Sequence, residues 1–476
     1  MNPSDPGSRI PDPGLLARDR AVVWHPYTQM QTAPPPLPIV RGKGVYLYTE
    51  DGREILDGIS SWWVNIHGHS HPALNAALAE QAARLEHVMF AGCTHPPAVD
   101  LAERLVARLP PGLTRVFYSD NGSTAVEVAV KLAAQYWTNR GEPQRTAFVA
   151  LHHAYHGDTV GAMSVSEASV FTRAFTPLLF SVARAHAPYC YRCPLGLERA
   201  TCGVECLGDL EGTLARLAGT AAAVLVEPML QGAGGMIVWP AEFLAGVRRL
   251  CDRYGVLMIA DEVLTGFGRT GRMFACEHAA VAPDIICLSK ALTAGYLPLG
   301  ATCTTDAVYE AFLSDDRSRT FFHGHSFTAN PLACAVALAS LDLFERERTL
   351  ARVARLEAQL RAGLAPLAGL PLVGDVRVIG GVGAIELVAD STVGTDPLTN
   401  RRGGPSGPPV GASGGAARYL DEIGPRLAAA FLTRGLLLRP LGNVLYFMPP
   451  YVITDEQAAW AIDQIGEVLE EVGARS

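Results

Sequence analysis

Short apolar runs alternate with longer stretches of helical periodicity through the middle of this chain. Five of these runs have the length of strands: residues 115–119, 146–151, 221–227, 256–261 and 284–289. Strands covered on both faces are apolar throughout, and strands separated by helices usually pair in parallel. The pattern therefore predicts an α/β domain built on a mostly parallel sheet, with helices covering both faces.

The pattern changes after about residue 335. A long charged helix is predicted over residues 341–364, and strands are predicted within residues 376–387 and 436–448. An acidic helix is expected from residue 454 to near the end of the chain. This order of elements is typical of a second, smaller α+β domain.

We accordingly divide the chain into three parts. Residues 1–70 form an N-terminal segment that packs with the small domain, residues 71–335 form the large domain, and residues 336–476 form the small domain. Within the last part, residues 391–417 are rich in Gly, Pro and Ser. Such a composition buries too little apolar surface to offset the entropy of ordering, so we expect a mobile insertion there.

Composition narrows the class of protein. The 476 residues are 49% hydrophobic and 18% charged with a net charge of -8, as in an ordinary globular protein without a basic face for nucleic acid. No stretch approaches the roughly 20 apolar residues that span a bilayer. The N-terminus, MNPSDPGSRIPDPG, lacks the apolar core of a secretory signal. We expect a cytoplasmic protein whose partners are small molecules or other protein chains.

A polar turn at residues 119–124, SDNGST, follows one predicted strand and begins a helix. The first N–H groups of a helix are unpaired and lie at the positive end of its dipole, so they bind phosphate well. Gly122 allows a close approach, and Ser123 adds a hydroxyl group. The alternative interpretation is a simple helix cap without a ligand.

Two further strands end in ionisable side chains. Asp261 follows the apolar run 256–260, and Lys290 follows the run 285–289. Ligands of open α/β sheets bind at the carboxyl ends of strands, so both side chains are expected to face one site. Taken singly, Asp261 also fits a capped turn or a magnesium ligand, and Lys290 also fits a surface position.

Together these three features match the requirements of pyridoxal phosphate (PLP). Lys290 would bind the cofactor covalently through its amine and later move the substrate proton. Asp261 would keep the ring nitrogen protonated, so that the ring withdraws electrons. We therefore predict an enzyme that transfers amino groups.

Several short motifs accompany these residues, and they extend from about residue 24 to the C-terminus. They are WHPYT at 24–28, SSWW at 60–63, SDNGS at 119–123, YHGDT at 155–159, LSKALT at 288–293, HGHSF at 323–327 and RPLG at 439–442. With them the chain resembles the class III aminotransferases of PLP fold type I. Within that class it is most similar to the enzymes of biotin biosynthesis that convert 8-amino-7-oxononanoate to 7,8-diaminononanoate.

The resemblance implies roles for individual residues around the cofactor. Gly122 and Ser123 would bind its phosphate, and Tyr155 would lie against its ring and border the substrate. His325 and Ser326 would reach the phosphate of the neighbouring subunit. This arrangement implies a homodimer with its active sites at the subunit interface.

The resemblance also implies a substrate pocket. Tyr27, Trp62 and Gly324 would line it beside Lys290 and Tyr155. Arg439 would bind the distant carboxylate of 8-amino-7-oxononanoate, a role suited to a planar and permanently charged guanidinium.

The motifs are compatible with more than one amino donor. The family implies S-adenosylmethionine. His325-Ser326 and the residues 295–298, GYLP, are more like a branch for which lysine is the proposed donor. A broader ω-amino-acid or diamine aminotransferase is a further alternative.

Four cysteines are grouped in one short segment. They are Cys190, Cys193, Cys202 and Cys206. Two close pairs of thiols can enclose zinc, although this spacing is irregular for a zinc site. We expect no metal here and interpret the group as free thiols, with structural zinc as the alternative.

Overall fold

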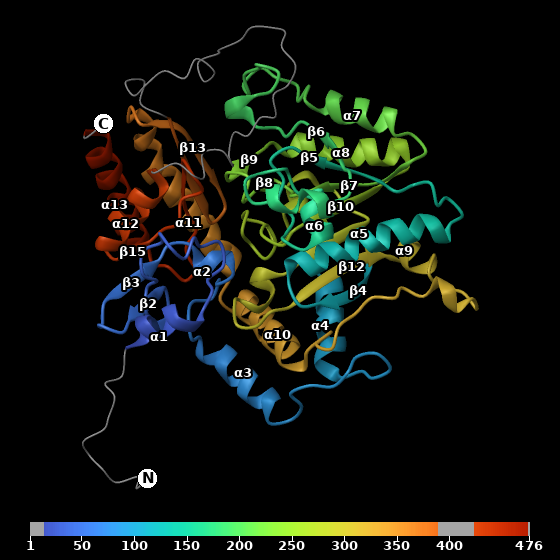
Figure 1. Ribbon diagram of the computed structural model, residues 1–476, viewed down its shortest axis with the longest axis horizontal. Helices are drawn as coiled ribbons and strands as arrows, with labels where there is room; N and C mark the ends of the chain where they lie inside the picture. The colour runs from blue at the N-terminus through green and yellow to red at the C-terminus, as the bar shows by residue number, and fades with distance from the viewer. Residues whose placement is uncertain (1–13, 389–422, 475–476) are drawn as a thin grey trace.

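A seven-stranded sheet forms the centre of the computed structural model, which describes residues 14–388 and 423–474 (Figure 1). In spatial order its strands are β4 (Leu113–Ser119), β12 (Gly300–Thr305), β11 (Ile285–Leu288), β10 (Leu257–Asp261), β7 (Ala221–Val226), β5 (Ala147–Leu151) and β6 (Ala183–Ala185). Only β12 runs antiparallel to its neighbours. The predicted mostly parallel sheet is confirmed.

The five predicted strands are all present, and two others were missed. The first, β6, is only three residues long. The second, β12, contains small and hydroxyl side chains in place of an apolar run. Two of its threonines are nevertheless buried, because Thr302 donates to the carbonyl of Ala125 at 2.7 Å and Thr304 donates to the carbonyl of Asp284 at 2.9 Å.

Helices cover both faces of this sheet. One face packs against α5 (Gly122–Asn139) and α6 (Val160–Val165). The other packs against α7 (Leu207–Arg216), α8 (Ala241–Tyr254), α4 (Pro96–Val106) and α10 (Pro331–Arg346). The short helices α3 (Pro72–Ala82) and α9 (Asp306–Glu310) lie at the periphery (Figure 1). No helix in residues 14–388 and 423–474 has the length and apolar content needed to cross a membrane.

Besides a two-stranded hairpin, two smaller sheets accompany the large one. The first is antiparallel and contains β13 (Val373–Ile379), β14 (Val382–Leu387) and β16 (Val444–Phe447). The second contains β1 (Ile39–Lys43), β2 (Tyr46–Thr49), β3 (Glu54–Asp57) and β15 (Leu436–Leu437). Because β3 pairs in parallel with β15, the N-terminal segment and the C-terminal region share one sheet. The domain boundaries themselves stay a prediction.

The long helix predicted over residues 341–364 was wrong as one element. The structure has α10, ending at Arg346, and then α11 (Thr349–Leu364). Arg348 has a φ of 50°, and this left-handed residue breaks the helical hydrogen bonding. Two further helices, α12 (Ile423–Thr433) and α13 (Asp455–Ala474), complete this region, while the predicted insertion 391–417 lies outside the described residues.

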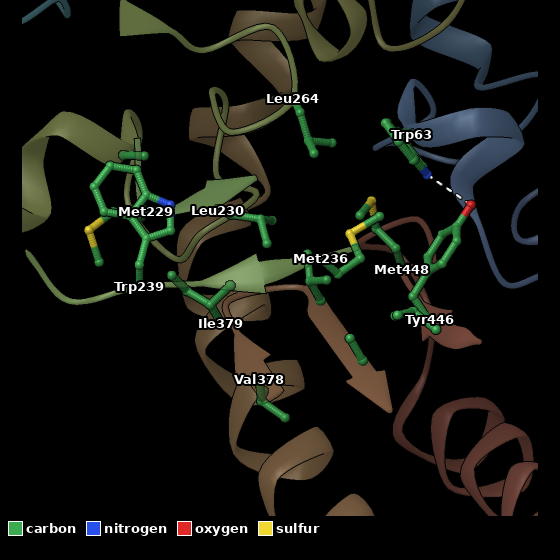
Figure 2. Packing of buried hydrophobic residues seen from close by; sticks show 14 of the residues in the cluster. Trp63, Met229, Leu230, Met236, Trp239, Leu264, Val378, Ile379, Tyr446 and Met448 are labelled. Atoms are coloured by element: carbon green, nitrogen blue, oxygen red, sulfur yellow. Dashed lines mark hydrogen bonds between the residues drawn. The ribbon is translucent and has the colours of Figure 1, made fainter. Parts of the chain in front are cut away.

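A hydrophobic core joins the three regions of the chain (Figure 2). Trp63 enters it from the N-terminal segment, and Met236 from the hairpin of β8 (Leu230–Gln231) and β9 (Ile237–Val238). Tyr446 and Met448 enter it from the C-terminal region. The indole N–H of Trp63 donates to the hydroxyl of Tyr446 at 3.0 Å, drawn as a dashed line in Figure 2. This core fixes the position of Trp63 beside the large sheet.

Candidate active site

Five of the predicted site residues meet at the carboxyl ends of β10 and β11, where ligands of α/β sheets bind. A cavity of about 430 Å³ opens there. Its lining includes Gly122, Ser123, Tyr155, Asp261 and Lys290. The structure therefore brings together the polar turn, the strand-end carboxylate and the strand-end lysine that the sequence analysis had identified separately.

Lys290 lies two residues beyond the end of β11 and begins a short 3-10 turn. Its φ of 41° is left-handed, which directs the chain sharply away from the strand. Its Nζ lies 4.8 Å from the centre of the Trp63 ring. The loss of bulk water around this amine lowers the pKa of Lys290 to about 8, although the carboxylates of Asp261 and Glu227 oppose the shift. A neutral, nucleophilic fraction of the amine is thus present near physiological pH, far larger than for a lysine in water.

Asp261 is the last residue of β10 and is almost completely buried. Its Oδ2 lies 2.7 Å from Nδ1 of His156, and its Oδ1 accepts the N–H of Val263 at 3.1 Å. These two bonds fix the orientation of the carboxylate. The sequence analysis included His156 in the motif YHGDT but gave it no role at the cofactor, although its position next to Tyr155 was the available signal.

Glu227 is a second buried acid that the sequence analysis missed. It follows β7, and its two oxygens accept the N–H groups of Tyr155 at 2.9 Å and of Gly232 at 3.0 Å. Burial raises the pKa of Glu227 to about 7. It lines the same cavity as Asp261, and it anchors the backbone at Tyr155.

The turn before α5 has the geometry of an anion site. Asn121 caps the helix by accepting the N–H of Thr124 at 3.0 Å, and Thr124 in turn accepts the N–H of Asn121. The N–H groups of Gly122 and Ser123 remain at the helix start. A Cβ on Gly122 would lie 2.5 Å from Cγ1 of Val263, so only glycine fits at this point.

These residues fit PLP by their chemistry. One cavity holds the Lys290 amine with its lowered pKa, a buried and oriented carboxylate at Asp261, and the start of α5 for a phosphate. Glycine at position 122 lets the start of α5 lie close against Val263, where a larger residue would displace it.

A second cavity, of about 530 Å³, adjoins the first. Trp63, Tyr155 and Lys290 line both cavities. Its other walls include Tyr27 and Trp62, whose ring centres are 5.6 Å apart. These shared residues make the second cavity a continuation of the first, with aromatic walls.

Charged and polar groups lie among these aromatic walls. The guanidinium of Arg439 is 4.4 Å from the centre of the Trp62 ring. Tyr27 donates a hydrogen bond to Asp158. Burial raises the pKa of Tyr155 well above its usual value, and contacts with Tyr27 and Asp158 raise it further. Tyr155 is therefore a neutral hydroxyl at physiological pH.

The tryptophan pair stands on an unusual backbone. The residues Ser60–Trp63, labelled α2, have φ values of 50°, 44°, 67° and 76°. The N–H of Trp63 donates to the carbonyl of Ile59 at 2.8 Å, and that of Val64 donates to the carbonyl of Ser60 at 3.0 Å. This is one turn of left-handed helix without glycine, which costs about 1–2 kcal/mol for each residue. Neither periodicity nor composition predicts such a turn.

Three predicted residues lie apart from both cavities in this single chain. Gly324, His325 and Ser326 belong to the lining of neither one. The N–H of His325 donates to the hydroxyl of Thr328 at 3.1 Å, and its buried Nε2 has no hydrogen-bond partner among the described residues. Their expected roles at the cofactor and substrate stay predictions.

The four grouped cysteines line a small separate cavity. Burial raises the pKa of Cys190, and that of Cys206 to about 11, so these thiols are protonated at neutral pH. Over residues 14–388 and 423–474, no three His, Cys, Asp or Glu side chains are arranged to hold a metal ion. The zinc alternative therefore gains no support from this geometry.

Comparison with known proteins agrees with the site. Residues 27–469 match the family model described as Aminotransferase class-III. The adenosylmethionine-8-amino-7-oxononanoate aminotransferase of Geobacter sulfurreducens is 47% identical over 458 residues, covering 95% of this chain and 97% of that protein.

Solved structures show the same relationship. The crystal structure of adenosylmethionine-8-amino-7-oxononanoate aminotransferase from Methanocaldococcus jannaschii is 38% identical with a TM-score of 0.85, covering 96% of this chain and 98% of that one. A PLP-bound amine transaminase from an uncultivated Pseudomonas species is 36% identical with a TM-score of 0.84, covering 94% and 98%.

The fold and the site thus define a PLP-dependent transaminase of fold type I. More specifically, this chain belongs to the class III aminotransferase family.

Proposed function

We propose that this enzyme transfers an amino group from S-adenosylmethionine to the C7 ketone of 8-amino-7-oxononanoate, giving 7,8-diaminononanoate in biotin biosynthesis. The observation that supports this most directly is the second cavity, where Tyr27 and Trp62 form an aromatic wall beside Arg439. Relatives named for this activity, including the aminotransferase of Geobacter sulfurreducens, support the same substrate.

The cofactor would be held by residues of the first cavity. The helix start at Gly122 and Ser123 would bind its phosphate, Asp261 its ring nitrogen and Lys290 its aldehyde carbon. When bound, PLP supplies an electrophilic carbon for amines and a ring that stabilises negative charge on the neighbouring carbon. His156 would act through Asp261, because the hydrogen bond of 2.7 Å between them holds that carboxylate in the orientation that the ring nitrogen needs.

Lys290 is the residue that moves protons in this proposal. With a pKa of about 8 it is both a competent base as an amine and a competent acid as an ammonium near neutral pH. The ring of Trp63, at 4.8 Å, shields it from water and stabilises the ammonium form through a cation–π contact.

The second cavity supports the proposed recognition of the oxo acid. The apolar carbon chain of the substrate packs along Tyr27 and Trp62. Its carboxylate pairs with Arg439, whose planar fork accommodates two oxygens at once. Trp62 stacks near this guanidinium at 4.4 Å and limits its movement.

We further propose that the active enzyme is a cytoplasmic homodimer. Large apolar side chains are exposed around the segment 323–327, namely Met89 at 61%, Phe322 at 73% and Phe327 at 62%. Exposed apolar groups gathered in this way favour burial against a second protein surface. Such packing would bring His325 and Ser326 to the neighbouring cofactor phosphate.

Lysine is the alternative donor, and one observation favours keeping it. Residues 295–298, which resemble the lysine-dependent branch, line the first cavity. A broader ω-amino-acid specificity shares the same fold, as the similarity to an amine transaminase indicates.

The experiment that tests the proposal mixes the purified enzyme with S-adenosylmethionine or with lysine and follows the PLP absorbance. S-adenosylmethionine is expected to bleach it. The treated enzyme should then aminate 8-amino-7-oxononanoate in preference to pyruvate or 2-oxoglutarate. If only lysine bleaches the absorbance, lysine and not S-adenosylmethionine is the amino donor. If pyruvate is the preferred acceptor, the assignment of 8-amino-7-oxononanoate is wrong.

A further inference from the structure

A buried carboxylate lies behind the left-handed turn that bears Trp62 and Trp63. Asp57, the last residue of β3, has 0% exposure. Its Oδ1 accepts the N–H of Ile59 at 3.3 Å and the N–H of Ser61 at 2.9 Å, and its Oδ2 accepts the hydroxyl of Ser61 at 2.7 Å. Asp57 therefore accepts three hydrogen bonds from Ser61, which is within the turn, and from Ile59, which precedes it.

A fourth donor reaches Asp57 from beyond the turn. Nε2 of His69 lies 2.9 Å from Oδ2, and since a carboxylate only accepts, the histidine donates. The other ring nitrogen of His69 lies 3.2 Å from the side-chain nitrogen of Asn65, which fixes the plane of the ring. Asp57 thus links the chain before the turn to the chain after it.

These bonds favour the left-handed conformation. Four successive non-glycine residues with positive φ are unfavourable alone, and the surrounding structure must hold them. Oδ1 of Asp57 accepts hydrogen bonds from the N–H groups of both Ile59 and Ser61, and it can do so only while the turn directs both N–H groups toward it. Without this acceptor the turn is free to return to negative φ, which would move the Trp62 ring from its place beside Tyr27.

The two tryptophans are held by different contacts. Trp63 is fixed on the core side by its bond to Tyr446, visible in Figure 2, and Ser60 donates to the carbonyl of Met448 at 2.7 Å. Trp62 faces the cavity and is 38% exposed, so it depends more on the turn itself. Loss of Asp57 should therefore disturb Trp62 more than Trp63.

We infer that Asp57 and His69 are positioning residues, which hold the left-handed turn and thereby set Trp62 against the substrate cavity beside Arg439. The inference rests on the proposed function, because it takes Trp62 as a wall of the substrate pocket. It assigns to Asp57 an effect on substrate binding that is larger than its effect on the chemical step at Lys290.

The test compares Asp57→Asn with a matched control. The amide keeps the volume of Asp57 but has one acceptor oxygen instead of two, so its NH2 group meets the donors on one side of the former carboxylate. The KM for 8-amino-7-oxononanoate should therefore rise about tenfold while kcat stays within about twofold. The near-ultraviolet circular dichroism of the tryptophans should weaken. Asp284→Asn is the control, because Asp284 also accepts a backbone N–H, that of Met258 at 2.7 Å, at the opposite end of β11 from Lys290.

A second variant tests the backbone directly. Glycine adopts positive φ without strain, so Asp57→Asn combined with Ser61→Gly should recover a KM within about threefold of wild type. A wild-type KM in Asp57→Asn, an equal rise in Asp284→Asn, or no recovery with glycine would each overturn the inference.

Two further measurements keep the outcomes distinct. If Asp57→Asn does not fold, His69→Ala, which leaves the turn's own bonds to Asp57, should show the same rise in KM to a smaller degree, and an unchanged KM would overturn the inference. If wild-type enzyme does not aminate 8-amino-7-oxononanoate, the proposed function fails. The dichroism of Asp57→Asn against Asp284→Asn then tests the turn alone, and identical spectra would overturn the inference.

Discussion

At the scale of single residues, the site depends on how burial changes ordinary side chains. Lys290 loses water and becomes a partly neutral amine, with its pKa lowered to about 8. Asp261 stays oriented because each of its two oxygens has a hydrogen-bond partner, one being His156 and the other the N–H of Val263. The same cavity therefore contains an amine and a carboxylate tuned by different neighbours, which is the arrangement expected for acid–base work.

The depressed pKa of Lys290 predicts a pH dependence. Its pKa falls from 10.5 to about 8 on folding, so between these values the unfolded chain binds a proton that the folded chain lacks. The unfolding free energy of the cofactor-free enzyme should therefore rise with pH across this window. Chemical denaturation at a series of pH values measures it. Lys290→Met should remove the rise, and an identical slope in that variant would exclude Lys290 as its source.

Arg439 predicts a loss confined to one half-reaction. In Arg439→Lys the ammonium cannot form the paired bonds of a guanidinium, so the KM for 8-amino-7-oxononanoate should rise about 10-fold to 100-fold. The donor half-reaction should stay near wild type. Single-turnover measurements of each half separate the two effects, and equal losses in both would count against the assigned role.

At the scale of elements, the site is assembled from strand ends and one helix start. The helix α5 begins where β4 ends, and its capping box involves Asn121 and Thr124. Two strand ends, at Asp261 and after Leu288, complete the first cavity. The left-handed turn at Ser60–Trp63 then adds the wall between the two cavities.

The helix cap predicts a measurable stability difference. Asn121→Ala removes the acceptor for the N–H of Thr124, which should lower the unfolding free energy by about 1 kcal/mol. Thr138→Ala, near the other end of α5, is the control, because its exposed hydroxyl bonds only within the helix. Urea denaturation compares the two variants, and equal midpoints would exclude the capping role of Asn121.

The strands made mainly of apolar residues could be predicted from the sequence, and so could the ionisable residues that follow two of them. Asp261 and Lys290 were found because a charge directly after an apolar run is conspicuous. Periodicity gave no signal for β12, whose threonines bond to carbonyls, or for the break at Arg348, which is a single left-handed residue. Glu227 and the role of His156 were missed because they depend on contacts between distant segments.

At the scale of the whole molecule, a core shared by three regions holds the site together. Trp63, Met236 and Tyr446 come from separate parts of the chain and pack in one cluster (Figure 2). The apolar side chains exposed near residues 323–327 would be buried if a second subunit packed against them, as the proposed homodimer requires. Since Gly324, His325 and Ser326 lie apart from both cavities in one chain, their expected roles require that subunit.

Mixed dimers test whether the sites are shared between subunits. Lys290→Ala lacks the amine, and Ser326→Asp should repel the phosphate bound by the neighbouring subunit. After subunit exchange, an equal mixture of the two variants should regain roughly a quarter of wild-type activity, because one site in each mixed dimer is intact. An activity no greater than that of the separate variants would contradict a shared site.

The most direct test of the account is a mass-spectrometric assay of product formed by purified enzyme from S-adenosylmethionine and 8-amino-7-oxononanoate. The account predicts 7,8-diaminononanoate with wild-type enzyme and none with Lys290→Ala. Absence of this product with wild-type enzyme that still aminates pyruvate would contradict it.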